Sequence, residues 1–132
     1  MPVSSITPML TVRDAAAAVE FYRKAFAAIE EERFTAPTGH IVVRMSIEGL
    51  PFFVVDENPE AFNLSPESLS GTSVRINLMV EDPDACASRA IAAGATELFA
   101  VADQPYGLRQ GRVEDPYGHH WLIGAPLTGS SS

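Results

Sequence analysis

The pentapeptide LTVRD at residues 10–14 is followed 68 residues later by LMVED at residues 78–82. An alanine-rich stretch of helical character comes directly after each, over Asp14–Ala28 and over Asp82–Ala95. Self-similarity at a fixed spacing, with the same elements in the same order, is the signature of a repeated structural unit. The sequence therefore predicts two copies of one module in a chain of 132 residues.

Both predicted helices carry recognisable end signals. Asp14 and Asp82 are suited to begin them, because an aspartate carboxylate can accept a hydrogen bond from a free backbone N–H of the first helical turn. In the first helix Val19, Tyr22 and Phe26 recur at three- and four-residue spacing. This spacing predicts a helix with one apolar face, which packs against a sheet.

Four strands are predicted in each half, because apolar and polar residues alternate and turn residues separate the segments. The predicted strands of the first half are Ile6–Val12, Ile29–Thr35, His40–Glu48 and Phe52–Asp56. Those of the second half are Ser73–Val80, Thr96–Ala102, Arg109–Glu114 and His120–Ala125. We expect a first βαβββ module over residues 1–58, a polar linker over 59–72, a second βαβββ module over 73–127 and a disordered tail over 128–132, all in one structural domain.

Alternation within the strands assigns their faces. In Ser73–Val80 the aliphatic residues share the face that we expect under the helix, whereas Arg75 and Asn77 share the other. In the first strand Thr7 and Met9 likewise point away from the helix. Each sheet then has an uncovered face of mixed polarity, which forms a cavity if it curls inward. The predicted fold is α+β, with two tandem βαβββ modules whose curved mixed sheets enclose a cavity.

Composition narrows the classes of function. No apolar segment approaches the ~20 residues that span a bilayer, and the net charge of −8 argues against a nucleic-acid partner. The single cysteine, Cys86, excludes an intramolecular disulfide framework. Residues 1–10 lack the basic and apolar regions of a secretory signal. We therefore expect a cytoplasmic protein without a membrane partner.

Two motifs resemble those of the vicinal oxygen chelate superfamily, which includes glyoxalase I, extradiol dioxygenases and bleomycin-resistance proteins. They are AVEFYRKAF at residues 18–26 and ADQPYGLRQGRVEDPYGHHW at residues 102–121. The second also matches the pattern DQ-x-[WY]-G-x-R-x-G … DP-[FY]-GH-x-W of the PhnB-like subgroup. The resemblance covers residues 6–127. It implies paired βαβββ modules and, as in bleomycin-resistance-like members, a homodimer with cavities near the interface.

Metal-using members of the superfamily place four ligands, usually His, Gln or Glu, on strands that face the cavity. Alignment of the motifs puts these positions at Thr7, Val54, Arg75 and Leu122. Valine and leucine have no donor atom, and an arginine repels a cation. We therefore expect no metal and no cofactor, and the resemblance gives no support for metal-dependent isomerisation or dioxygenase chemistry.

The adjacent histidines His119 and His120 should point in different directions. We expect His119 to form a structural hydrogen bond in the turn and Trp121 to belong to the core. His120 is expected on the cavity face, two residues from Leu122, where it could contact a ligand or act as acid or base.

Arg75 is the strongest single candidate for function. An inward arginine is costly unless it meets a carboxylate, a wet pocket or an anionic ligand, and these alternatives stay open. Asp56 is a second candidate acid or base, near the expected cavity mouth. The predicted ligand-binding residues are Thr7, Met9, Phe34, Val54, Arg75, Asn77, Tyr106, Arg109, His120 and Leu122.

Two functions follow, and whether the chain is an enzyme stays open. The first is a metal-independent protein that binds or sequesters an antibiotic-like or aromatic metabolite, as in drug self-resistance; the acidic charge and aromatic residues fit a cationic or planar aromatic ligand. The alternative is a metal-independent lyase, isomerase or cyclase of secondary metabolism, with His120 or Asp56 as acid or base and Arg75 steadying an oxyanion. A purely structural dimer ranks last, because it predicts aliphatic residues in place of Arg75 and Asn77.

Overall fold

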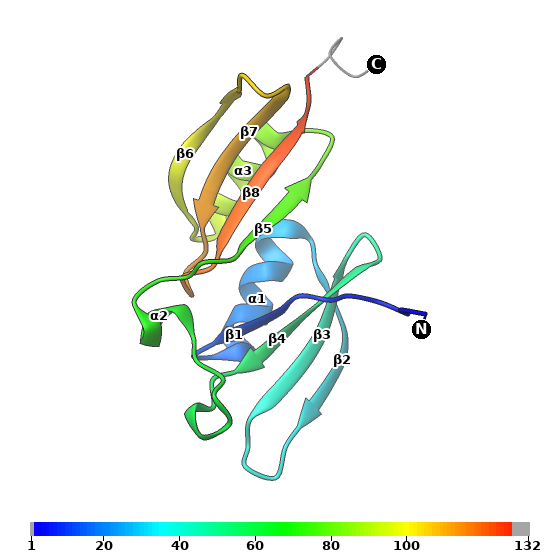
Figure 1. Cartoon of the computed structure of the whole chain (residues 1–132), viewed down its shortest axis with the longest axis vertical. Coiled ribbons are helices and arrows are strands. Elements are labelled where there is room, and N and C mark those ends of the chain that lie inside the picture. Colours follow the sequence, from blue (N-terminus) through cyan, green and yellow to red (C-terminus); the bar gives the residue numbers. More distant parts are fainter. Residues whose placement is uncertain (1, 128–132) are drawn as a thin grey trace.

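The two modules form separate sheets in the computed structural model, which describes residues 2–127. The predicted tail at 128–132 therefore lies outside the described residues. In chain order the elements are β1 (Met9–Val12), α1 (Ala15–Phe26), β2 (Ile29–Thr35), β3 (Ile41–Ile47), β4 (Leu50–Asp56), η1 (Pro59–Ala61), α2 (Pro66–Leu69), β5 (Arg75–Met79), α3 (Pro83–Ala93), β6 (Thr96–Asp103), β7 (Leu108–Glu114) and β8 (His120–Pro126). Figure 1 shows the two sheets end to end.

Both modules have the same topology. The strand orders are β1-β4-β3-β2 and β5-β8-β7-β6. In each sheet the first strand runs parallel to the last, with Leu10 opposite Val54 and Leu78 opposite Ile123, and the other neighbours are antiparallel. The predicted α+β fold of two βαβββ modules is confirmed. The sheets are not closed, however, so a single chain does not enclose the predicted cavity.

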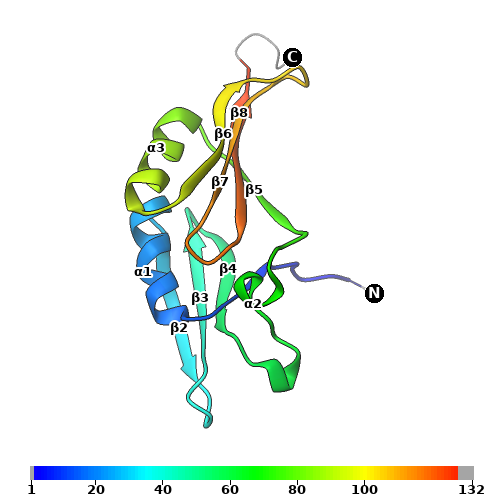
Figure 2. The same ribbon diagram turned by 90° about the vertical axis from the view of Figure 1, so that its left-hand side faces the viewer.

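The two long helices begin at the predicted aspartates. Asp14 accepts a hydrogen bond from the backbone N–H of Ala17, and Asp82 accepts one from that of Ala85, each at 3.1 Å. These bonds satisfy donors that a helix start leaves free. The helices α1 and α3 lie on the same side of the molecule, as Figure 2 shows, and the opposite side of both sheets stays largely uncovered.

One hydrophobic core crosses the boundary between the modules. The ring centroid of Trp121, on β8, lies 4.6 Å from that of Phe26 and 5.5 Å from that of Tyr22, both on α1. Phe52, on β4, contacts the same indole at 6.0 Å. Trp121 is 1% exposed, which confirms its predicted place in the core. The second module thus packs its largest side chain against the helix and sheet of the first.

A buried carboxylate joins the modules at the same place. Asp115 accepts hydrogen bonds through Oδ2 from the Tyr22 hydroxyl at 2.5 Å and the Trp121 indole at 3.0 Å. Its Oδ1 accepts from the backbone N–H groups of Tyr117 and His119 at 2.9 and 3.0 Å. Burial raises the pKa of Tyr22 well above its usual value, and the charge of Asp115 raises it further. The DPYGHHW turn is therefore built around a fully used carboxylate.

The predicted linker is more ordered than its composition indicates, since it contains η1 and α2. Ser65 begins α2, accepting from the backbone N–H of Ser68, while the carboxylate of Glu57 accepts from both the backbone N–H and the hydroxyl of Ser65.

A second difference from the predicted elements is that β1 begins at Met9 and not at Ile6. Among the helices of residues 2–127, none is long and apolar enough to cross a membrane.

We expect Asp115→Asn to lower the free energy of unfolding by about 1–3 kcal/mol. Asparagine replaces one of the two accepting oxygens by an NH2 group, which cannot accept a hydrogen bond, so at least one buried donor loses its acceptor. Urea denaturation measures the change, with the exposed Glu60→Gln as control. Equal stability of the Asp115 variant and the control would contradict the structural role given to this carboxylate.

The raised pKa of Tyr22 predicts a specific alkaline instability. In the unfolded chain Tyr22 ionises near its ordinary pKa of 10.0, whereas the folded protein keeps it protonated, so rising pH above 10 favours unfolding. The free energy of unfolding should therefore fall more steeply between about pH 9 and 11 in the natural protein than in Tyr22→Phe. Parallel curves in urea titrations would show that Tyr22 is not the group responsible.

Candidate functional site

The uncovered face of the second sheet carries the most concentrated set of functional groups. Strand register places Asn77, Leu122, Arg112 and Phe99 in one row across β5, β8, β7 and β6. These side chains point away from α3, because Ile123, the neighbour of Leu122, is fully buried on the helix side. The row therefore combines an amide, a guanidinium and two apolar groups on one open surface.

A pocket of about 230 Å³ lies at the β6–β7 end of this row. It is lined by Phe99, Gln104, Tyr106, Gln110, Gly111, Arg112 and Leu122. The Tyr106 hydroxyl donates to Oε1 of Gln110 at 2.6 Å, and Nε2 of Gln104 donates to the backbone carbonyl of Gln110 at 3.0 Å. These bonds brace the turn between β6 and β7, from which Tyr106 borders the pocket.

Arg112 occupies the centre of the pocket lining. The central carbon of its guanidinium lies 5.5 Å from the centroid of the Phe99 ring, within the range of a cation–π contact. Its Nε is buried and has no hydrogen-bond partner among the described residues. Arg112 is not among the predicted ligand-binding residues, although alternation along β7 puts it on the face opposite Arg109.

The neighbouring row holds Arg75, His120 and Glu114 on β5, β8 and β7. Nε2 of His120 lies 3.7 Å from Oε1 of Glu114, an ion pair when the imidazole is protonated. Arg75 is exposed and forms no ion pair within residues 2–127. His120 thus lies on the open face beside Leu122, where the alternation of the strand predicts it.

Arg109 has a different place from the one expected. It lies on the helix-covered side of β7, where Nε and Nη2 donate to the carboxylate of Asp84 on α3 at 2.7 and 2.8 Å. Nη1 donates to Asp103 on β6 at 2.8 Å. These two carboxylates raise the pKa of Arg109 above its ordinary value. Arg109 therefore ties α3 to the sheet and does not line the pocket.

Two first-module residues also require correction. Val54 is fully buried on the helix side of β4. The two modules are offset by 68 residues at their first strands but by 69 at their last strands, since Met9 pairs with Phe53 and Asn77 pairs with Leu122. The counterpart of Leu122 is thus Phe53. Asp56 accepts from the backbone N–H groups that begin α1 and β3, one at each carboxylate oxygen, both at 2.8 Å. It braces the fold and does not face the open side.

The other predicted residues of the first module lie on its uncovered face or just before it. Met9 and Phe34 are 58% and 61% exposed on β1 and β2, and Thr7 precedes β1. A salt bridge between Arg44 and Glu32 occupies the same face. Within one chain this surface and the pocket around Arg112 belong to separate sheets, so the structure does not bring the two groups of predicted residues together.

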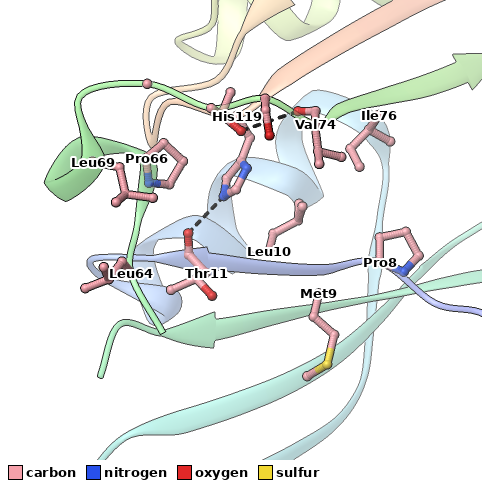
Figure 3. Close-up of a pocket in the computed structure, with 13 residues that line it drawn as sticks. Pro8, Met9, Leu10, Thr11, Leu64, Pro66, Leu69, Val74, Ile76 and His119 are labelled. Carbon is pink, nitrogen blue, oxygen red and sulfur yellow. Dashed lines mark hydrogen bonds between the residues drawn. The ribbon is translucent and has the colours of Figure 1, made fainter. Parts of the chain in front are cut away.

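A larger cleft of about 420 Å³ lies where the modules meet (Figure 3). It is lined by Pro8, Met9, Leu10, Thr11, Leu64, Pro66, Leu69, Gly71, Thr72, Ser73, Val74, Ile76 and His119. Nε2 of His119 is 2.9 Å from the backbone carbonyl of Thr11, a hydrogen bond that joins the turn before β8 to β1. The lining is mostly aliphatic, and His119 serves the structural role that we expect of it.

The residues present do not fit a divalent metal. Of the positions that align with metal ligands, Arg75 is cationic, Leu122 and Phe53 lack donor atoms, and Thr7 offers one hydroxyl. In the described part of the chain, no group of three or more His, Cys, Asp or Glu residues is arranged to hold a metal ion. These residues therefore do not support a reaction step that needs a bound divalent metal ion.

Comparison with known proteins gives the family. A model described as a glyoxalase-like domain matches residues 8–123. The chain belongs to this family. A protein of Mycobacterium tuberculosis is 42% identical to this glyoxalase-like chain over 127 residues, which cover 93% of the chain and 75% of that protein. The predicted superfamily is thereby confirmed, whereas the PhnB-like subgroup stays a prediction.

Solved structures have the same fold. TioX of a Micromonospora species is 26% identical to the glyoxalase-like chain with a TM-score of 0.70, covering 95% of this chain and 100% of that one. FosX, the fosfomycin resistance protein of Listeria monocytogenes, is 17% identical with a TM-score of 0.75, and each chain is covered in full. The second similarity is one of fold alone.

We expect Arg109→Gln to lower the urea midpoint at low salt, because it removes the pairs with Asp84 and Asp103. These pairs are exposed and screened by salt, so the difference from the natural protein should shrink near 1 M NaCl. A midpoint difference that is independent of salt would instead point to lost packing of the side-chain stem.

Proposed function

We propose that this glyoxalase-like protein binds a small molecule with a planar aromatic ring, an antibiotic-like compound or aromatic metabolite, in the pocket around Arg112 and without a metal ion. The observation that carries the proposal is the pair of aromatic side chains at this pocket. Phe99 and Tyr106 are 63% and 61% exposed although both border it. Rings that a ligand can cover contribute burial energy and ~0.5–1.5 kcal/mol for each aromatic pair.

A second copy of the chain would cover the pocket. The open face of each sheet carries exposed apolar side chains, Met9 and Phe34 on the first and Met79 and Phe99 on the second. Large exposed apolar surfaces mark interaction sites. We propose a homodimer in which the first sheet of one subunit faces the second sheet of the other. The separate groups of predicted residues would then share one cavity.

We also place the protein in the PhnB-like subgroup and in the cytoplasm. The motif between Asp103 and Trp121 supports the first assignment. FosX is a fosfomycin resistance protein, and we propose a comparable resistance role here, in which binding alone removes the compound. What supports this role is the shared fold together with an aromatic pocket that does not require a metal.

One observation favours a second candidate function, metal-independent proton transfer. His120 has a carboxylate partner, Glu114, within 3.7 Å, and Arg75 lies opposite it on β5. A histidine oriented by a carboxylate can act as a general base, and an adjacent guanidinium can stabilise a developing oxyanion. In this alternative the role falls to His120 and not to Asp56, whose two oxygens already accept backbone hydrogen bonds.

A thermal-shift screen of antibiotics and aromatic metabolites tests the proposal. Ligands that raise the melting temperature should bind at least about tenfold more weakly to Phe99→Ala and to Tyr106→Ala, because each change removes about 1.4 kcal/mol or more of aromatic contact. The matched control is Phe62→Ala, since Phe62 lies in the linker, is 90% exposed and does not line this pocket.

Mass spectrometry of the recovered ligand separates the two candidate functions. An unchanged mass supports binding or sequestration, whereas a new mass that His120→Ala abolishes supports proton transfer. Equal weakening by Phe99→Ala and Phe62→Ala would contradict the proposed pocket. Light scattering should give the mass of two chains, and a monomer at working concentration would contradict the shared cavity.

A further inference from the structure

The distribution of charge on the open face of the second sheet differs from that of the whole chain. The protein has 17 acidic residues and a net charge of −8. Five arginines form ion pairs with carboxylates: Arg13, Arg23, Arg33, Arg44 and Arg109. Arg75, Arg89 and Arg112 form none with the described residues, and of these three Arg75 and Arg112 lie on this face. Of the two arginines on this face that lack a carboxylate partner, Arg112 lines the proposed pocket and Arg75 lies outside its lining.

Acceptors of Gln110 and Glu114, the residues two positions before and after Arg112 on β7, are already engaged. Oε1 of Gln110 accepts from Tyr106, and the backbone carbonyl of Gln110 accepts from Gln104. The carboxylate of Glu114, two residues along β7, faces His120. The Nε–H of Arg112 is buried without an acceptor, which is unfavourable as it stands. Because Nε is buried, an incoming acceptor would meet the Nη groups of the same guanidinium, which lines the pocket.

The geometry of the site restricts the form of that acceptor. Phe99 contacts the guanidinium at 5.5 Å, which fixes the guanidinium against its ring. A guanidinium presents its two Nη groups side by side, and this fork matches the two oxygens of a carboxylate. The aromatic rings of Phe99 and Tyr106 border the same pocket. A ring that stacks there could place a carboxylate substituent at Arg112.

We propose that the ligand is an aromatic carboxylate, whose carboxylate group is bound by Arg112 and whose charge is also stabilised by Arg75. Strand spacing puts the Cα atoms of these arginines roughly 12 Å apart, a distance that two extended arginine side chains can span to reach one small molecule. This inference rests on the proposed aromatic pocket and adds the sign of the ligand's charge. It replaces the cationic ligand that the acidic composition favours.

Three probes with the same ring test the inference: 2-naphthoate, neutral 2-naphthamide and the cation 2-naphthylmethylammonium. Calorimetry of the full chain near pH 7 should show 2-naphthoate binding at least about tenfold more tightly than the amide, and the cation binding most weakly. Arg112→Gln should abolish the preference for the carboxylate. Arg109→Gln, a change of the same residue type on the opposite face of β7, should keep it.

The outcomes separate this inference from the proposed function. If the three probes bind with equal affinity and Phe99→Ala weakens all of them, the aromatic pocket stands and the carboxylate inference is overturned. If none binds, both are overturned for this ring class. Arg112 could instead pair with a carboxylate of a second copy. In that case Arg112→Gln would dissociate the dimer in light scattering and leave the probe preference unchanged, which also overturns the inference.

Discussion

The structure depends on one buried carboxylate at the boundary of the modules. Asp115 receives four hydrogen bonds, from the side chains of Tyr22 and Trp121 and from two backbone groups of its own turn. Because Tyr22 belongs to α1, these bonds fix the start of β8 relative to the first module. The alternation of β8 then decides that His120 and Leu122 face outward. The chemistry of the open face is therefore set from inside the core.

The sequence predicted the elements well because their signals are local. Helix caps at Asp14 and Asp82, alternation in the strands and the core position of Trp121 need no knowledge of distant contacts. The repeat predicted the topology, and the motifs predicted the family. Closure of the sheets could not be predicted from alternation, because it depends on how two modules pack, and the described chain leaves both faces open.

The predicted positions of individual site residues were wrong where strand register or contacts with distant parts of the chain determine the direction of a side chain. A single extra residue in the spacing of the last strand moved Val54 to the helix side, since a shift of one reverses every side chain of a strand. Asp56 and Arg109 found partners far along the chain, at the start of α1 and on α3. Arg112 was missed because its significance lies in what it lacks, an acceptor for Nε, and sequence alone does not show unmet hydrogen bonds.

The acidic strand β2 has a consequence for assembly. It forms the outer edge of the first sheet, and its backbone would be a template for another strand. Three consecutive glutamates at 30–32 and an irregular register against β3 make that edge a poor template. Pairing between exposed strand edges can extend a sheet from one chain to the next. The negative charge and irregular register of β2 thus disfavour pairing of this edge with a strand of another chain.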